Sequence, residues 1–232
     1  MMSLTQTCLV LLGLSGSALF AHSATLLDSA YLAWSRTAVE SIGQKMRVTG
    51  RVGGLFDSHG THTERAHNYK LRATWFTPEL IRASARYWQL QNRLSDDETR
   101  ALVREAESAG DIVIMVELDP NEGSGVIPND WVAVLRTKES RAEVRGTLSP
   151  FLRDLKGLSG TFQRDYDYDV FWVVFQCADE KGRAVISEDA TELELLVGVH
   201  NKSGKATWKI PPSFRSSLRT SAPVVPNRSL PN

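Results

Sequence analysis

Residues 166–177, with the sequence YDYDVFWVVFQC, decide the class of fold. Every residue from Val170 to Phe175 is apolar, and a strand of that composition must be covered on both faces. The β-branched and aromatic side chains of this run favour a strand over a helix. The stretch therefore predicts a central strand in the hydrophobic core, with Cys177 as a small buried side chain near its end.

Strand patterns recur on both sides of this stretch. Apolar and polar residues alternate with period two over residues 46–56 and 69–75, which predicts two half-buried strands joined as a hairpin through a polar loop. Residues 112–118 are apolar on both faces and predict a second central strand. The remaining predicted strands lie at residues 131–136, 143–148, 192–200 and 206–210, the last two joined across residues 201–205.

A change of period marks two helices between the second and third predicted strands. Residues 77–79 read Thr-Pro-Glu, which places Thr at an N-cap and Pro at the first helical position. Ser95 and Glu98 form a capping box that begins the second helix. Residues 77–110 are therefore predicted as a helical insertion, and residues 24–45 as a separate N-terminal helical segment.

These elements amount to about seven strands at the spacing of a sandwich, with no glycine-rich phosphate loop and no regular strand–helix alternation. We predict a mainly β fold at residues 46–212, an immunoglobulin-like antiparallel β-sandwich with a two-helix insertion. The alternative is an α+β fold in which helices cover one face of an antiparallel sheet. Residues 213–232 are predicted as a disordered tail, because almost none of their side chains are large and apolar.

Composition and charge exclude several classes of protein. Of 232 residues, 42% are hydrophobic and 23% charged, which is ordinary for a globular chain. Lys and Arg together number 27, as do Asp and Glu, so the net charge is zero. A dedicated nucleic-acid binder shows a basic excess, and we therefore expect no nucleic-acid partner.

The N-terminus differs in kind from the rest of the chain. No charged side chain precedes Asp28, and residues 8–20 form an apolar run of the length found in signal peptides. Ala21 and Ser23 have the spacing of the −3 and −1 positions of a cleavage site. We predict a signal peptide at residues 1–23 and location in the periplasm, cell envelope or medium.

The same N-terminal segment departs from the usual signals in two ways. No Lys or Arg precedes the apolar run, so an uncleaved N-terminal membrane anchor stays open as an alternative. Residues 14–17 resemble a lipobox, but Ser17 stands where the acylated Cys would be. No lipid is therefore expected at this position, and membrane contact is expected only through the N-terminal segment, if it is uncleaved.

A histidine-rich loop is the one candidate metal site. His59, His62 and His67 lie close together with Asp57 and Glu64, and imidazoles and carboxylates are ligands that Zn²⁺ takes. Polar residues are also common in hairpin loops without any ligand. Ordering such a loop around an ion would cost conformational entropy. The solvated loop is the favoured interpretation, with a zinc site as the alternative.

Other groupings of reactive side chains do not complete a catalytic site. The His59 to His62 segment resembles the histidine motif of subtilisin-like proteases, but no serine motif or parallel-sheet pattern accompanies it. Asp165, Asp167 and Asp169 share one face of their strand, which favours a solvated strand start over a Ca²⁺ site completed by residues 119–122. We therefore expect no enzyme and no cofactor, apart from the possible zinc.

The order of strands resembles a loosely defined set of uncharacterised bacterial exported proteins, often lipoproteins. The resemblance lies in strand motifs: residues 69–75, the Leu-Asp-Pro turn at residues 118–120, the Trp-led strand at 131–135, residues 168–172 and the Ala-Thr-Trp strand at 206–208. It implies an envelope-facing, β-rich domain and no particular activity. The serine at the lipobox position departs from the lipoprotein members.

Two functions stay open at this point. The favoured one is an exported, non-enzymatic binding or structural domain whose partner is an envelope protein or another envelope component. The alternative is a metal-binding protein or a small metal-dependent hydrolase that uses His59, His62 and His67.

Overall fold

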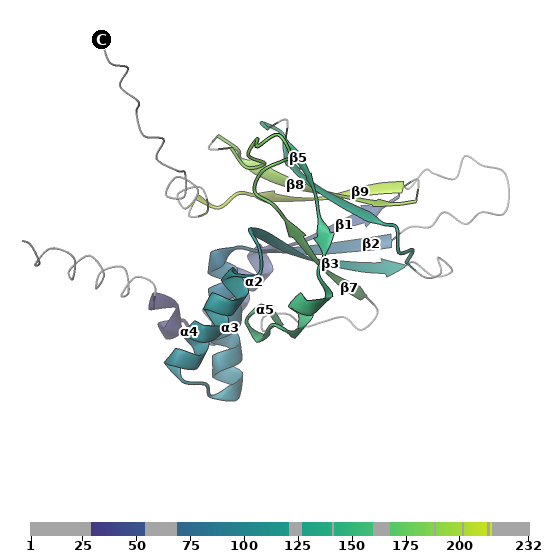
Figure 1. Cartoon of the computed structure of the whole chain (residues 1–232). Helices are drawn as coiled ribbons and strands as arrows, with labels where there is room; N and C mark the ends of the chain where they lie inside the picture. Colours follow the sequence, from purple (N-terminus) through teal and green to yellow (C-terminus); the bar gives the residue numbers. More distant parts are fainter. Residues whose placement is uncertain are drawn as a thin grey trace, which may run out of the picture.

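The computed structural model describes residues 29–53, 69–120, 127–140, 142–159, 168–187, 189–200, 202–212 and 214. Within these residues one antiparallel sheet has the strand order β5-β4-β8-β9-β1-β2-β3-β7-β6 (Figure 1). Its strands are β1 (Arg47–Val52), β2 (Tyr69–Phe76), β3 (Ile112–Pro120), β4 (Val132–Thr137), β5 (Glu143–Arg145), β6 (Thr147–Leu148), β7 (Asp169–Phe175), β8 (Glu192–Val199) and β9 (Lys202–Lys209).

The two ends of this sheet are one stretch of chain. Strand β5 pairs with β4 and strand β6 pairs with β7, and only Gly146 separates β5 from β6. The sheet therefore nearly closes on itself as a barrel. A Cβ atom on Gly146 would lie 2.3 Å from Cγ1 of Val173 and 2.7 Å from the ring of Phe175. Glycine is needed here because the bend presses the backbone against the interior.

The prediction of a mainly β, antiparallel fold with a helical insertion is confirmed. The immunoglobulin-like sandwich is not confirmed, because the strands form one nearly closed sheet instead of two packed sheets. The region predicted as one short strand at residues 143–148 is two strands that pair with different neighbours. The last hairpin is also tighter than predicted: β9 begins at Lys202, and His200 turns the chain with a φ of 53°.

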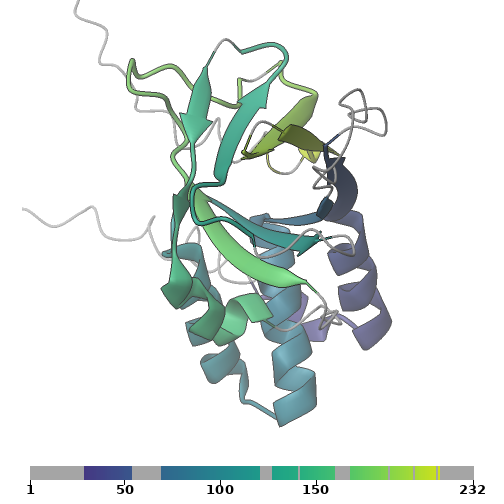
Figure 2. The same ribbon diagram turned by 90° about the vertical axis from the view of Figure 1, so that its right-hand side faces the viewer.

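Helices gather on one side of the sheet, against its β2-β3-β7 part (Figures 1 and 2). Thr77 caps one of them by accepting a hydrogen bond from the Leu80 amide, and Ser95 and Glu98 form the predicted capping box of the next. No helix in the described part of the chain has the length and apolar character needed to cross a membrane. The helical elements are η1 (Ala30–Ala33), α2 (Arg36–Lys45), α3 (Pro78–Asn92), α4 (Asp96–Glu107), η2 (Pro150–Asp154) and α5 (Lys156–Ser159).

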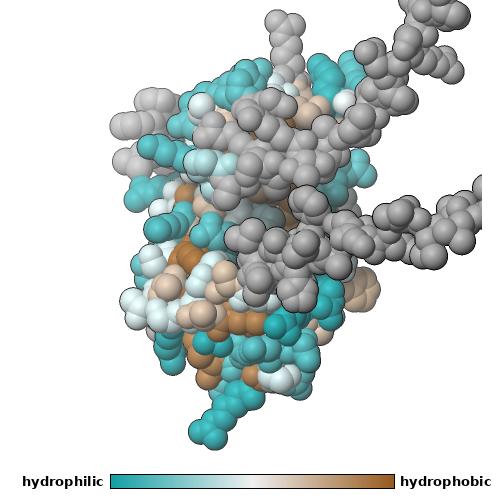
Figure 3. Space-filling view, turned by 90° about the vertical axis from the view of Figure 1, so that its left-hand side faces the viewer, coloured by the Kyte–Doolittle hydropathy of each residue, from teal (hydrophilic) through white to brown (hydrophobic). Residues whose placement is uncertain are grey.

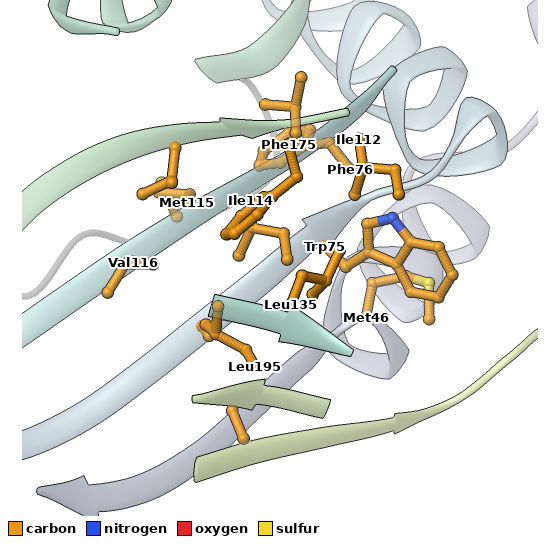
Figure 4. Close-up of a cluster of buried hydrophobic side chains, with 14 of the residues drawn as sticks. Met46, Trp75, Phe76, Ile112, Ile114, Met115, Val116, Leu135, Phe175 and Leu195 are labelled. Atoms are coloured by element: carbon orange, nitrogen blue, oxygen red, sulfur yellow. The ribbon is translucent and has the colours of Figure 1, made fainter. Parts of the chain in front are cut away.

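The core lies inside the barrel and continues beneath the helices. Figure 4 shows Trp75 and Ile114 of one wall in the same cluster as Leu135 and Leu195 of the other. All four are fully buried. Strand β7 is part of this core on both faces: Val173 is buried inside, and Trp172 is buried against Phe76 with ring centroids 5.1 Å apart. The predicted central strand at residues 166–177 is thus confirmed for the residues that form β7.

The end of the folded region lies beyond the predicted boundary at residue 212. Phe214 is only 8% exposed, and its ring centroid lies 4.8 Å from that of Trp75. The Phe214 amide donates a hydrogen bond to the Pro211 carbonyl, which turns the side chain back onto the core. Phe214 therefore belongs to the domain although its neighbours in sequence are polar.

This placement predicts different outcomes for two truncations. Removing residues 215–232 should leave the melting temperature nearly unchanged. Removing residues 213–232 also removes the buried Phe214 ring and should cost about 2 kcal/mol, a loss of several degrees. Thermal unfolding followed by circular dichroism measures both. Phe214→Ala in the full chain should reproduce the second loss, and equal melting temperatures for the two truncations would contradict the placement.

Candidate ligand-binding groove

The first and last strands in chain order, β1 and β9, meet along an incomplete seam. Strands β1 and β9 share a single ladder pair, Val52 with Gly204. At that point the backbones touch, and a Cβ on Gly204 would lie 2.1 Å from the Arg51 carbonyl oxygen. The backbones stay close as far as Gly50, where a Cβ would lie 2.5 Å from the Lys205 carbonyl oxygen. Beyond it, toward Met46 and Trp208, no ladder pair forms and the seam opens into a groove.

A groove of about 420 Å³ occupies this opening. Volumes of this size fit small organic ligands, and barrel mouths are common places for such sites. Its walls come from the end of α2, the start of β1, the start of α3 and the end of β9. The lining residues are Ile42, Lys45, Met46, Val48, Glu79, Thr207, Trp208, Lys209 and Pro211.

The floor of the groove is apolar and held in place. The Trp208 indole N–H donates a 2.8 Å hydrogen bond to the Met46 carbonyl, which ties the end of β9 to the start of β1. The Thr77 hydroxyl lies 3.7 Å from the Met46 sulfur and donates to it. The Trp208 ring also packs edge-on against Trp75, with centroids 6.2 Å apart. An apolar ligand would thus meet a preformed surface.

The rim of the groove is charged. Lys45, Lys209 and Glu79 are all exposed, and none of the three forms an ion pair with a described residue. Two ammonium groups therefore stand against one carboxylate at the edge of an apolar floor. This arrangement suits a ligand with an apolar body and one acidic group.

A second groove, of about 600 Å³, lies between β5, β7 and the segment after β7, and it is polar. Two of its charges already satisfy each other, because Arg183 contacts the Asp179 Oδ2 atom through two guanidinium nitrogens, at 2.6 and 2.7 Å. The Asp179 Oδ1 atom accepts hydrogen bonds from the Lys181 and Arg183 amides. Burial raises the pKa of Asp179, but the hydrogen bonds from Arg183 and Lys181 outweigh it and hold that pKa below its ordinary value. The Asp179–Arg183 pair is therefore not available to a charged ligand in this groove.

Cys177 does not have the chemistry of a nucleophile. Burial and, after it, the nearby Asp111 carboxylate raise the pKa of the Cys177 thiol to about 11. At neutral pH the thiol stays protonated, and the thiolate is the reactive form. Cys177 was predicted to be buried, but just after β7 it is half-buried and packs against the edge of the core.

The predicted metal ligands His59, His62 and His67 lie outside the described residues, as do Asp165 and Asp167, so the zinc prediction stays a prediction. Among the described residues no three His, Cys, Asp or Glu side chains lie close enough to hold a metal ion.

The calcium alternative gains no support from the two described carboxylates. Asp169 pairs across the ladder with Leu118, whereas Asp119 lies on the other face of the sheet and binds the Lys70 ammonium at 2.9 Å.

Most of the tryptophans pack in the core. Trp75, Trp131, Trp172 and Trp208 are buried, and Trp34 and Trp88 are half-buried. On the face in Figure 3, apolar side chains reach the surface in separate patches between hydrophilic ones. The groove was not predicted, because residues 42–48 and 207–211 are brought together only by the meeting of the first and last strands.

No family model, curated protein or solved structure matches this chain. The geometry of the described residues is therefore the basis for a functional proposal.

Proposed function

We propose that this protein is an exported, non-enzymatic binding domain of the bacterial cell envelope, and that the groove between β1 and β9 is its binding site. The observation behind this proposal is an apolar, hydrogen-bonded floor at the open seam of an otherwise packed barrel. The proposed ligand is an amphiphile, with an apolar chain on Val48, Met46 and Trp208 and an acidic group near Lys45 and Lys209.

Physical chemistry favours this ligand class over a purely apolar one. Burying a short alkyl chain contributes about 0.8 kcal/mol for each CH₂ group removed from water. The two exposed lysines add attraction for an anion, at about 0.2–1 kcal/mol for each exposed pair. The apolar floor thus supplies most of the affinity, and the lysines supply the preference for an acid.

Export is the second part of the proposal. Its support is the apolar run at residues 8–20 and the small residues Ala21 and Ser23 that follow it. We expect the mature protein to begin near Ala24 without an attached lipid. Intact mass spectrometry of protein expressed in a bacterial host measures this directly, and a full-length or lipid-bearing mass would contradict it.

Calorimetric titration tests the groove. Decanoate should bind, and 1-decanol, with the same chain and no charge, should bind several-fold more weakly because it lacks the attraction to Lys45 and Lys209. Val48→Trp should abolish decanoate binding, because Val48 lines the groove and a bulky ring would fill it. The matched control is Thr49→Trp, which adds the same ring on the opposite, exposed face of β1.

The outcomes separate the parts of this proposal. Equal affinity of Val48→Trp and the wild type for decanoate would place binding elsewhere. The double variant Lys45→Gln/Lys209→Gln should lower the affinity for decanoate to that for decanol. Equal affinity of the wild type for decanoate and decanol would show that the two lysines play no role. Absence of decanoate binding by the wild type would overturn the groove as a site for amphiphiles.

A further inference from the structure

An exposed apolar tip lies where β6 runs into η2. Phe151 is 79% exposed and Leu148 is 46% exposed, and these are the two most exposed large hydrophobic side chains of the described residues. Pro150, between them, is also exposed. We refer to Leu148, Pro150 and Phe151 as the apolar tip.

The backbone holds the apolar tip out toward solvent. The Ser149 amide donates a 2.8 Å hydrogen bond to the Trp172 carbonyl of β7, which fixes the start of η2 to the sheet. Leu152 follows directly and is buried, with an amide bonded to the Ser149 carbonyl. Because Leu152 is buried and the Ser149 backbone is bonded on both sides, Phe151 cannot turn inward without breaking these contacts. Its exposure is thus a feature of the folded state.

Cationic side chains surround the apolar tip. Arg145 lines a groove of about 540 Å³ together with Leu148, and Arg153 and Lys156 follow Phe151 in η2 and α5. All three cations are exposed. The local acids are Asp154, which lies 3.7 Å from Arg153, Asp130, which lines the same groove as Arg145, and Glu143, which is bonded to Arg136 at 3.2 Å. Apart from the Glu143–Arg136 pair, three cations therefore stand against two acids near the apolar side chains.

We propose that the apolar tip inserts into the interfacial region of an anionic phospholipid bilayer. A protein partner would need a buried patch of about 800 Å² on each side, whereas the apolar tip offers only three adjoining apolar residues on a protruding turn. A bilayer accepts a few apolar side chains at headgroup depth, and cations beside them gain about 1 kcal/mol each from anionic lipids. The inference goes beyond the groove and needs no ligand there.

Co-sedimentation of the mature protein, which we expect to begin near Ala24, with phospholipid vesicles tests this contact. The wild type should bind vesicles of phosphatidylcholine containing phosphatidylglycerol more strongly than vesicles of phosphatidylcholine alone, and added salt should weaken the binding. Phe151→Ala should lower the partition coefficient between vesicles and water at least tenfold, because the Phe151 ring would make most of the apolar contact with the bilayer. Leu90→Ala, at the third exposed large hydrophobic residue, should leave it unchanged.

Two further readouts keep the outcome clear. The melting temperature of Phe151→Ala should equal that of the wild type because the side chain makes little contact in the folded protein, and decanoate binding should persist. A double variant Arg145→Gln/Arg153→Gln should remove the preference for phosphatidylglycerol. Equal partition of Phe151→Ala and the wild type, or binding with no preference for anionic lipid, would overturn the proposal. Failure of vesicle binding together with a dimer that Phe151→Ala dissociates would assign the apolar tip to a second copy instead.

Discussion

Replacing Trp75 by alanine should lower the free energy of unfolding by about 3–5 kcal/mol, the range for deleting a large buried aromatic side chain. The Trp75 side chain is fully buried inside the barrel and packs against both Trp208 and Phe214. An ordinary domain has only about 5–15 kcal/mol of stability, so the variant should lie close to its unfolding threshold. Urea denaturation of the wild type and the variant measures the difference.

Trp172→Ala should cost a similar amount, because that ring is buried against Phe76 on the outer face of β7. The control is Trp34→Ala. The Trp34 ring directly follows η1, is half-buried and packs edge-on against Tyr31. Its removal should lower the free energy of unfolding clearly less. A larger loss at Trp34 than at Trp75 or Trp172 would mean that the core has been placed wrongly.

Glu117→Gln should be the most damaging change of a charged residue, at about 3 kcal/mol. The Glu117 side chain is 1% exposed on the outer face of β3, 3.6 Å from the Arg72 guanidinium and 3.9 Å from that of Arg47. Arg72 in turn lies under the Tyr168 ring, at 4.3 Å from the centroid. Loss of the carboxylate would leave two partly buried cations beside each other without their shared anion.

The control for this change is Glu143→Gln. Glu143 of β5 forms an ion pair with Arg136 of β4. Glu143 and Arg136 lie 3.2 Å apart, with side chains 56% and 39% exposed, so water screens their attraction. This substitution should cost less than about 1 kcal/mol. Chemical denaturation at neutral pH compares the two variants, and equal losses would show that burial does not strengthen the role of Glu117.

Local signals in the sequence predicted the elements well. The capping box at Ser95 and Glu98 marked the start of α4, and alternation marked β1 and β2. These signals are local because a cap or a pleat depends on residues within a few positions. The apolar run in β7 likewise identified a strand that is covered on both faces, by the barrel interior and by the helices.

The way the sheet closes could not be predicted from such signals. The strands form one nearly closed sheet through the β1–β9 pair and the bend at Gly146, and an isolated glycine in a strand has several meanings. The groove depends on the meeting of Met46 and Trp208, which are far apart in sequence and lie on elements that look ordinary by themselves. Phe214 was assigned to the tail because its neighbours are polar, although its own ring belongs to the core.

The position of β1 beside β9 has a consequence for how the chain folds. As synthesis proceeds, the barrel interior lacks Leu193, Leu195 and Trp208 until the last two strands emerge. Of the opposite wall, Trp75 and Ile114 then have only Leu135 on β4, and no early intermediate can bury them fully. The chain must therefore stay loosely packed until residue 209 is available, and such late closure is slow because its contacts are distant in sequence. The export proposed above would gain from this order, because premature closure would block the passage of an unfolded chain across a membrane.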